Sequence, residues 1–169
     1  MRVDSARFAG RPDPPNAFEG SDHVVVVDAP QLLEMSPDEL ATLFRSSNAG
    51  EIPVGKMHGT VLIAPGTQIA GPAMRFARLL VWQGKVFDPV QGDLRNLILP
   101  IGIEAVRAKV YKDASWFDKQ ETIVLDYSKT SFVAKKIRDE IREVSPAVYL
   151  GLVFWDRSMI LHFALTRPN

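Results

Sequence analysis

The sequence predicts a mainly β protein, an antiparallel barrel of about eight strands with two short helices. Short apolar runs recur at hairpin spacing through residues 55–166, and clusters of Gly, Pro, Asp and Ser separate them. Few segments between these runs have helical periodicity, which disfavours a parallel sheet because parallel strands need crossover helices. Short strands joined by hairpins therefore favour a barrel or a strongly bent sheet.

The composition is that of one soluble globular domain. Hydrophobic residues make up 46% of the 169 residues and charged residues 24%, so the chain is large enough to bury a core. Glycines and prolines interrupt any periodicity in residues 1–21, which predicts an extended N-terminal arm before a single barrel domain over residues 22–169. No apolar run is long enough for a membrane span, and the N-terminus lacks the apolar core of a secretory signal, so we expect a cytoplasmic protein.

The charge balance and the missing cysteines exclude several partners and sites. Twenty basic residues against twenty acidic ones give no basic excess, so nucleic acid is not an expected partner. The absence of cysteine excludes disulfides, thiolate zinc sites and a cysteine nucleophile. Three histidines, His23, His58 and His162, are left for metal or base chemistry, and we expect no metal site. The sequence leaves the oligomeric state open.

Two segments are expected to be helical. Ser36 can cap a helix, Pro37 suits its first turn, and Glu39 completes a capping box. The Asn-Ala-Gly sequence at 48–50 ends this helix with C-cap chemistry. The spacing of apolar residues in 72–80 predicts the second short helix.

The remaining periodic segments are expected to be strands. In the first of them, Met57 and Val61 fall on one face while His58 and Thr60 fall on the other. Turn sequences such as Gln-Gly-Asp and Asp-Arg-Ser separate neighbouring strands. The expected strands span residues 55–64, 81–87, 94–99, 104–112, 121–127, 137–144, 148–155 and 159–166.

Several short motifs resemble those of one bacterial family. Gly55-Lys56-Met57-His58-Gly59 has the spacing of a GXWXG motif, and the sequence WQGKVF at 82–87 resembles the W-x-G-K-x-F motif that follows it. The end of the chain is similar to the same family's ending through Asp126-Tyr127, Asp139, Arg142, Val144, Leu150-Gly151 and the F-x-L-x-R sequence at 163–167. The family is the GXWXG-type bacterial domain of unknown function. The resemblance covers residues 55–167 and implies a lipocalin-like barrel of the calycin type.

Two positions differ from this family's pattern. Met57 stands where the motif has tryptophan, and Asp126-Tyr127 reverses the usual Tyr-Asp order. Because side chains alternate along a strand, the reversal turns the Asp126 carboxylate to the opposite face of the strand.

The leading hypothesis for function is the binding of one hydrophobic small molecule, such as a fatty acid, a lipid or a polyketide-like compound. A small barrel open at one end holds a single apolar ligand, and a few inward polar groups orient its head. A buried arginine could bind a ligand carboxylate through two parallel hydrogen bonds, although a structural ion-pair network is the alternative role for such arginines. The candidate ligand-binding residues are Met57, Trp82, Tyr127, Arg138 and Arg142.

The runner-up is a cofactor-independent enzyme, an isomerase, cyclase or hydratase, that acts on a lipophilic substrate in the same cavity. The sequence has no nucleophile elbow, H-E-x-x-H, G-x-G-x-x-G or Walker motif. An apolar cavity can still make a carboxylate or histidine basic enough for proton transfer. The candidate catalytic residues are Asp126, Asp139 and His162, with Tyr127 or Arg142 as the polarising group.

A third and weaker hypothesis is a haem-binding barrel with His162 as the iron ligand. His162 lies between Leu161 and Phe163 in an apolar final strand, where a histidine could reach a bound haem. The ordinary alternative for such a histidine is a hydrogen bond within the core.

Overall fold

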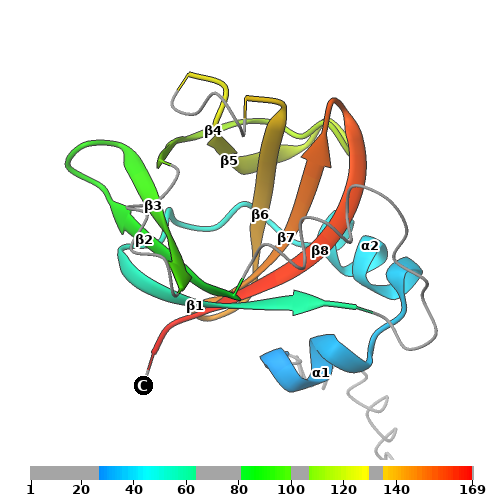
Figure 1. Cartoon of the computed structure of the whole chain (residues 1–169). Helices are drawn as coiled ribbons and strands as arrows, with labels where there is room; N and C mark the ends of the chain where they lie inside the picture. Colours follow the sequence, from blue (N-terminus) through cyan, green and yellow to red (C-terminus); the bar gives the residue numbers. More distant parts are fainter. Residues whose placement is uncertain (1–26, 64–80, 100–106, 130–134, 169) are drawn as a thin grey trace, which may run out of the picture.

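The structure is a computed structural model that describes residues 27–63, 81–99, 107–129 and 135–168. Eight antiparallel strands form a closed barrel, in which strands adjacent in sequence pair with each other and β1 pairs with β8 (Figure 1). The strands are β1 Gly55–Leu62, β2 Val81–Asp88, β3 Asp93–Leu99, β4 Arg107–Ala114, β5 Glu121–Asp126, β6 Ile137–Ser145, β7 Val148–Trp155 and β8 Ser158–Thr166. The predicted fold class is confirmed, and each expected strand corresponds to an observed one.

Two short helices precede the barrel in the described part of the chain, α1 Ala29–Glu34 and α2 Pro37–Ser46. The predicted capping box of α2 is present, since the Ser36 hydroxyl accepts a bond from the Glu39 backbone and the Glu39 carboxylate accepts one from the Ser36 backbone at 2.8 Å. The prediction missed α1, whose six residues are too few to give a periodic signal. The expected helix at 72–80 and the expected arm at 1–21 lie outside the described residues.

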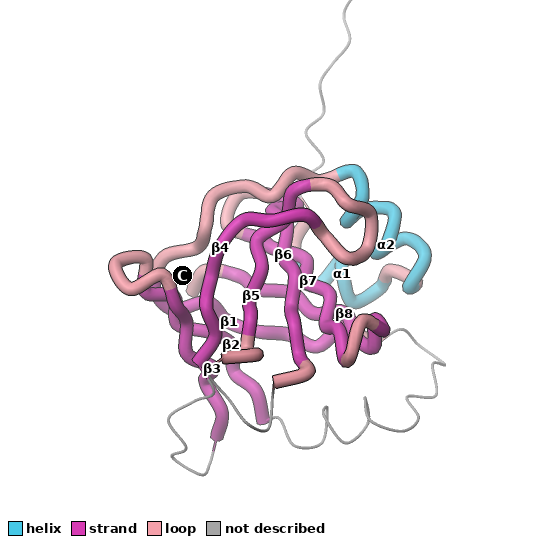
Figure 2. Tube along the Cα trace, turned by 90° about the horizontal axis from the view of Figure 1, so that it is seen from above, coloured by secondary structure: helices cyan, strands magenta, loops and turns pink. Residues whose placement is uncertain are grey.

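The barrel has one apolar core inside it and another on its outer surface. The inner core includes Met57, Phe87, Leu94, Val110, Ile123, Leu125, Ile137, Ile141, Val153, Leu161, Phe163 and Leu165. The outer core lies where α1 packs on β1 and β8 and α2 packs on β6 and β7 (Figure 2). It contains Val27, Leu32, Leu40, Phe44, Leu62, Leu150, Leu152, Phe154 and Ala164. Each fully buried large apolar side chain contributes about 1.5–3 kcal/mol to the stability of the fold. Apolar contacts therefore stabilise both faces of β6 and β7.

Three glycines allow aromatic rings and backbone to approach closely inside the barrel. A Cβ on Gly59 would lie 2.5 Å from the ring of Trp82, and one on Gly151 would overlap the ring of Phe163. The rings of Trp82 and Phe163 meet edge to face with centroids 5.4 Å apart. Gly84 has φ +132° and marks a bulge where the register of β2 against β3 shifts. This bulge inserts one extra residue in β2, so Trp82 packs against the inner core although it is three residues from Lys85.

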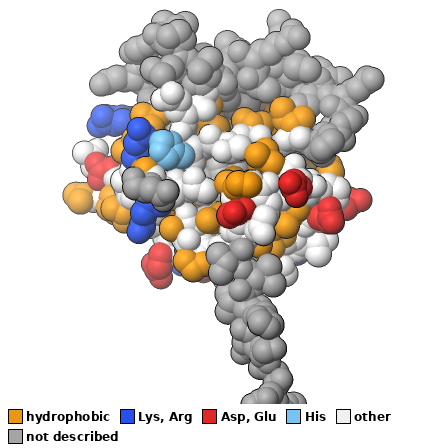
Figure 3. All heavy atoms as spheres, turned by 90° about the horizontal axis from the view of Figure 1, so that it is seen from below, with side chains coloured by type: hydrophobic (Ala, Val, Ile, Leu, Met, Phe, Trp, Pro, Cys, Tyr) orange, Lys and Arg blue, Asp and Glu red, His pale blue; other side chains and the backbone are white. Residues whose placement is uncertain are grey.

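The surface seen from below carries both signs of charge (Figure 3). On this face, basic side chains gather on one side beside a histidine, and acidic side chains predominate on the other. Within the described ranges, neither helix is long and apolar enough to cross a membrane.

Candidate functional site

Four polar side chains meet inside the barrel, and we call them the Lys85 cluster. They are Lys85 on β2, Asn96 on β3, Tyr127 just after β5 and Asp139 on β6. The ammonium of Lys85 donates to Oδ1 of Asn96 at 2.9 Å, to the hydroxyl of Tyr127 at 2.6 Å and to Oδ2 of Asp139 at 2.8 Å. All four residues are at least nine-tenths buried, with Lys85 3% and Asp139 4% exposed. The cluster is thus an ion pair with two neutral partners in an apolar interior.

The ion pair crosses the interior of the barrel from wall to wall. In the closed order β1 to β8, three strands separate β2 from β6 in either direction, so the two strands face each other across the barrel. Lys85 shares the inward face of β2 with Phe87, and Asp139 shares that of β6 with Ile137 and Ile141. Asn96 is the cross-strand partner of Lys85 in the β2–β3 ladder.

Aromatic rings surround the ammonium group of Lys85. Its nitrogen lies 5.2 Å from the ring centroid of Trp82 and 5.4 Å from those of Tyr127 and Phe163. The negative faces of aromatic rings attract cations within about 6 Å. The rings therefore compensate in part for the water that this ammonium group has lost.

Two members of the Lys85 cluster, Tyr127 and Asp139, lie near one end of the barrel, whereas Lys85 and Asn96 lie at the middle of β2 and β3. The strands β1, β3 and β5 end there, and β2, β4 and β6 begin there. Tyr127 directly follows the last residue of β5, and Asp139 is only two residues beyond the first residue of β6, a rise of about 7 Å. The residues that link these strands in sequence, 64–80, 100–106 and 130–134, lie outside the described residues. Farther from this end the interior is filled by apolar side chains, among them Phe87, Leu94 and Ile123.

Burial shifts the titration of two members of the Lys85 cluster. Loss of water lowers the pKa of Lys85 from its ordinary value near 10.5, while the charge of Asp139 acts in the opposite direction. Burial, followed by the charge of Asp139, raises the pKa of Tyr127 well above 10. Tyr127 is therefore a neutral phenol at physiological pH, able to donate a proton or a hydrogen bond.

One oxygen of the cluster has no hydrogen bond within the described chain. Oδ2 of Asp139 accepts bonds from Lys85 at 2.8 Å and from the Tyr127 hydroxyl at 3.0 Å. Oδ1 of Asp139 is buried and accepts none from the described residues. Buried carboxylate oxygens are normally hydrogen-bonded, so Oδ1 of Asp139 is an exception among the described residues.

The structure divides the residues proposed from sequence between two faces of the barrel. Met57, Trp82, Tyr127 and Asp139 belong to the interior, whereas Asp126, Arg138, Arg142 and His162 lie on the outer side. The expected convergence of these acids, arginines and histidine in one cavity is therefore not observed. The reason is strand alternation, because positions 138 and 142 on β6 point away from position 139.

Asp126 lies at the outer edge of β5 and is partly exposed. It accepts a hydrogen bond from the Tyr111 hydroxyl at 3.2 Å and one from the Ser128 backbone at 2.8 Å. Asp126 and Tyr127 thus lie on opposite faces, as expected for adjacent residues of an extended chain.

The two arginines join β6 to the surrounding loops. Arg138 donates to Glu140 at 2.9 Å and to the carbonyl of Ala114 at 2.9 Å. Arg142 donates to both carboxylate oxygens of Asp118 at 2.7 Å and to the carbonyl of Phe44 at 2.8 Å. These contacts are those of a structural ion-pair network between β6, α2 and the β4–β5 turn.

His162 lies on the outer face of β8, opposite Leu62 on β1 and Leu152 on β7. It is 7% exposed, and its Nε2 has no hydrogen bond to the described residues. Burial lowers the pKa of His162 from 6.5. His162 is therefore separate from the Lys85 cluster, and a haem bound through it would not occupy that site.

The sequence interpretation missed Lys85 and Asn96 as site residues. Lys85 was noted only as a motif residue, although it lies two positions from Phe87 on the same face of β2. Asn96 lies two positions from Leu94 on β3 and is 9% exposed. A polar residue in phase with the apolar positions of a strand was the signal that could have identified both.

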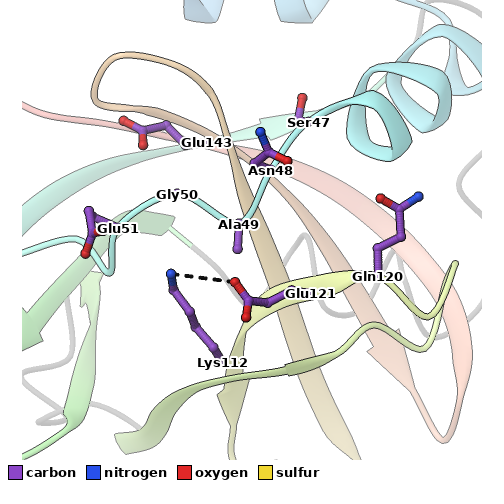
Figure 4. Close-up of a pocket in the computed structure, with 9 residues that line it drawn as sticks. All are labelled: Ser47, Asn48, Ala49, Gly50, Glu51, Lys112, Gln120, Glu121 and Glu143. Atoms are coloured by element: carbon purple, nitrogen blue, oxygen red, sulfur yellow. Dashed lines mark ion pairs between the residues drawn. The ribbon is translucent and has the colours of Figure 1, made fainter.

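A polar pocket lies at the opposite end of the barrel. It has a volume of about 440 Å³ between the segment 47–51 and the β4–β5 hairpin (Figure 4). Lys112 and Glu121 form an exposed ion pair at its edge, with 3.7 Å between nitrogen and oxygen. Glu51 and Glu143 also line it. This pocket is separated from the Lys85 cluster by the inner core.

Tyr149 connects the segment beside this pocket to the inner core and gives a prediction for alkaline pH. Its hydroxyl donates to the carbonyl of Glu51 at 2.8 Å, and burial raises its pKa to about 12. A pKa raised above the unfolded value near 10 gives stability that is present below pH 10 and is lost as pH rises toward 12. Tyr149→Phe should be about 1 kcal/mol less stable than wild type near pH 9, for loss of the hydrogen bond, and this gap should narrow toward pH 12.

Urea denaturation of wild type and Tyr149→Phe, near pH 9 and toward pH 12, checks this prediction. Other titrating groups, including Lys85 and Tyr127, are common to both proteins, so their effects cancel in the difference. A gap that stays constant or widens would contradict it.

Comparisons with known proteins support the fold alone. No family model matches the chain, so the resemblance to GXWXG-type domains gains no support there, and no curated protein matches it either. The chain is similar to a solved structure described as a protein from Thermomonospora curvata, with 15% sequence identity and a TM-score of 0.58. The match covers 80% of this chain and 90% of that one. At the level of architecture, the eight-stranded antiparallel closed barrel matches a lipocalin-like fold, and such a barrel is compatible with a ligand-binding interior.

Proposed function

We propose that the barrel binds one lipophilic small molecule, such as a lipid or polyketide-like compound, whose polar group meets the Lys85 cluster. The observation that supports this proposal is the fully buried Lys85–Asp139 ion pair across an aromatic-lined interior. A buried ion pair contributes little net stability, because desolvation offsets its attraction, and apolar residues often replace it without loss. Its placement is better explained by recognition of a polar group in an otherwise apolar site.

The position of the cluster is consistent with this function. The apolar part of the ligand would contact Trp82 and Phe163, whose rings flank the ammonium group of Lys85. The inner core beyond the cluster is filled, so the ligand would approach from the end of the barrel where β2 and β6 begin.

The test uses the neutral fluorescent probe N-phenyl-1-naphthylamine and two matched tryptophan variants. We expect saturable binding of one probe molecule per wild-type chain. Trp82→Leu should weaken binding about tenfold, because an aromatic contact of this kind contributes on the order of 1.4 kcal/mol. Trp116→Leu makes the same substitution on the outer face, where Trp116 contacts Phe154 and Arg138, and should leave binding unchanged.

Two results would count against binding inside the barrel. One is the absence of saturable probe binding by the wild-type protein. The other is equal weakening by the two tryptophan variants, which would place the probe elsewhere or indicate a general effect on folding. Native mass spectrometry of the purified protein would show independently whether a lipid remains bound.

A second candidate function is acid–base catalysis on a lipophilic substrate in the same interior. The observation that favours it is the buried Asp139 carboxylate with one oxygen that accepts no bond from the described residues, beside the neutral phenol of Tyr127. Of the three acid–base candidates from sequence, Asp139 is the one that faces the inner core. A carboxylate and a phenol in contact can supply a base and an acid.

This second function predicts a product that depends on Asp139. Incubation of the wild-type protein with a lipid extract, followed by mass spectrometry, should show a converted compound that Asp139→Asn does not form. Circular dichroism of the variant would establish that it is folded. Equal conversion by the two proteins would contradict a catalytic role for Asp139.

A further inference from the structure

We infer that the bound molecule presents an uncharged hydrogen-bond donor, such as a hydroxyl group, to Oδ1 of Asp139, and that a carboxylate is disfavoured at this position. The inference rests on the proposed binding function and specifies the chemical class of the ligand: a lipophilic alcohol or phenol instead of a fatty acid.

The hydrogen bonds within the Lys85 cluster determine which atom is available. Lys85 has three ammonium protons, and the three acceptors Asn96, Tyr127 and Asp139 lie 2.6–2.9 Å from its nitrogen. No proton of Lys85 is left for a ligand acceptor. Oδ1 of Asp139 accepts no bond from the described chain, so a ligand that donates a hydrogen bond would satisfy a buried polar atom.

The charge of the cluster favours the same class of ligand. Lys85 and Asp139 neutralise each other, and their side chains are 4% and 5% exposed. A ligand carboxylate near Oδ1 would bring a second negative charge next to Asp139 in a site from which water is largely excluded. A hydroxyl adds no charge.

The arginines that could have received a carboxylate are not in the interior. Arg142 is fully buried on the outer face and pairs with Asp118. Arg138 pairs with Glu140 on the same face. Recognition of a fatty acid head by either arginine would therefore require a site outside the barrel.

The test compares three ligands built on the same unbranched chain of twelve carbon atoms. Dodecan-1-ol, dodecanoate and methyl dodecanoate compete with bound N-phenyl-1-naphthylamine at pH 8, where the acid is ionised. Of the three compounds, dodecan-1-ol alone has a hydrogen-bond donor for Oδ1. It should displace the probe at a concentration about tenfold lower than dodecanoate or methyl dodecanoate, because about one net hydrogen bond to a charged group has this effect.

A double substitution tests whether Asp139 causes the preference. Lys85→Met with Asp139→Leu removes both charges together and leaves no unpaired buried ion. This variant should bind the alcohol and the methyl ester equally. The matched control, Lys112→Met with Glu121→Leu, removes the exposed ion pair at the far end of the barrel and should keep the wild-type preference.

The outcomes separate this inference from the proposed function. Absence of probe binding would mean that the proposed function is wrong. If the probe binds but dodecanoate displaces it as well as or better than dodecan-1-ol does, the inference is overturned and the proposed function is not. The same holds if the probe binds and none of the three compounds displaces it. An alcohol preference that survives in a folded Lys85→Met, Asp139→Leu variant would overturn it as well, and if that variant does not fold, the wild-type comparison still decides.

Discussion

Arg142→Met is expected to destabilise the protein by roughly 3–5 kcal/mol, the cost of removing one partner from a buried ion pair. Arg142 is 0% exposed, and its guanidinium donates to Asp118, to the carbonyl of Phe44 and to the carbonyl of Glu121. Methionine fills much of the same volume but donates nothing. The variant would therefore leave the carboxylate of Asp118, whose side chain is 8% exposed, without the two hydrogen bonds that Arg142 donates.

Urea denaturation of wild type and variant measures this loss. Lys136→Met is the matched control, because it breaks an ion pair of 3.2 Å whose side chains are 50% and 68% exposed, and such pairs contribute at most about 1 kcal/mol. A loss for Arg142→Met no larger than that of the control would show that the network does not hold β6 to α2. If the variant is folded, its probe binding should equal that of wild type, since Arg142 lies outside the barrel.

The fold was predictable because its signals are local. Turn residues and apolar alternation locate the strands within a few residues, and hairpin spacing determines the order of pairing. The capping box at Ser36 located α2 for the same reason. The short helix α1 has a capping box at Asp28, but its six residues make too weak a pattern. Local signals thus identified the strands and one helix of the described chain.

The residues of the site were less predictable than the fold, because the strands that form the site do not alternate between buried and exposed residues. On β6 every residue from Ile137 to Arg142 is buried, since one face meets the interior and the other meets the loops and α2. The sequence therefore could not tell Asp139, which faces inward, from Arg138 and Arg142, which face outward. Closure of the barrel then determined which inward residues meet.

The bulge on β2 obscured the other half of the site. Trp82 and Lys85 are three residues apart, an odd spacing that places two side chains on opposite faces of a regular strand. The register shift between Trp82 and Gly84 brings both into the interior. Contact between Lys85 and Asp139 depends in addition on strands that are not neighbours, which no local pattern encodes.

Lys85→Met should destabilise the protein by roughly 3–5 kcal/mol, because it leaves the Asp139 carboxylate buried without a cation. Asp139→Leu should cost a similar amount, since it leaves the ammonium group of Lys85 buried without its anion. The double variant removes both charges and should recover most of the stability, so the two losses are strongly non-additive.

A double-mutant cycle from urea denaturation of the four proteins measures this coupling. The cycle distinguishes an ion pair retained for recognition from one retained for stability. One decisive result is a double variant that is as stable as wild type and yet binds dodecan-1-ol no better than methyl dodecanoate. This result would show that the barrel folds without the ion pair and uses the pair to select a ligand. Losses that simply add would mean instead that Lys85 and Asp139 do not interact in solution, and the wall-to-wall contact at 2.8 Å would have no energetic role.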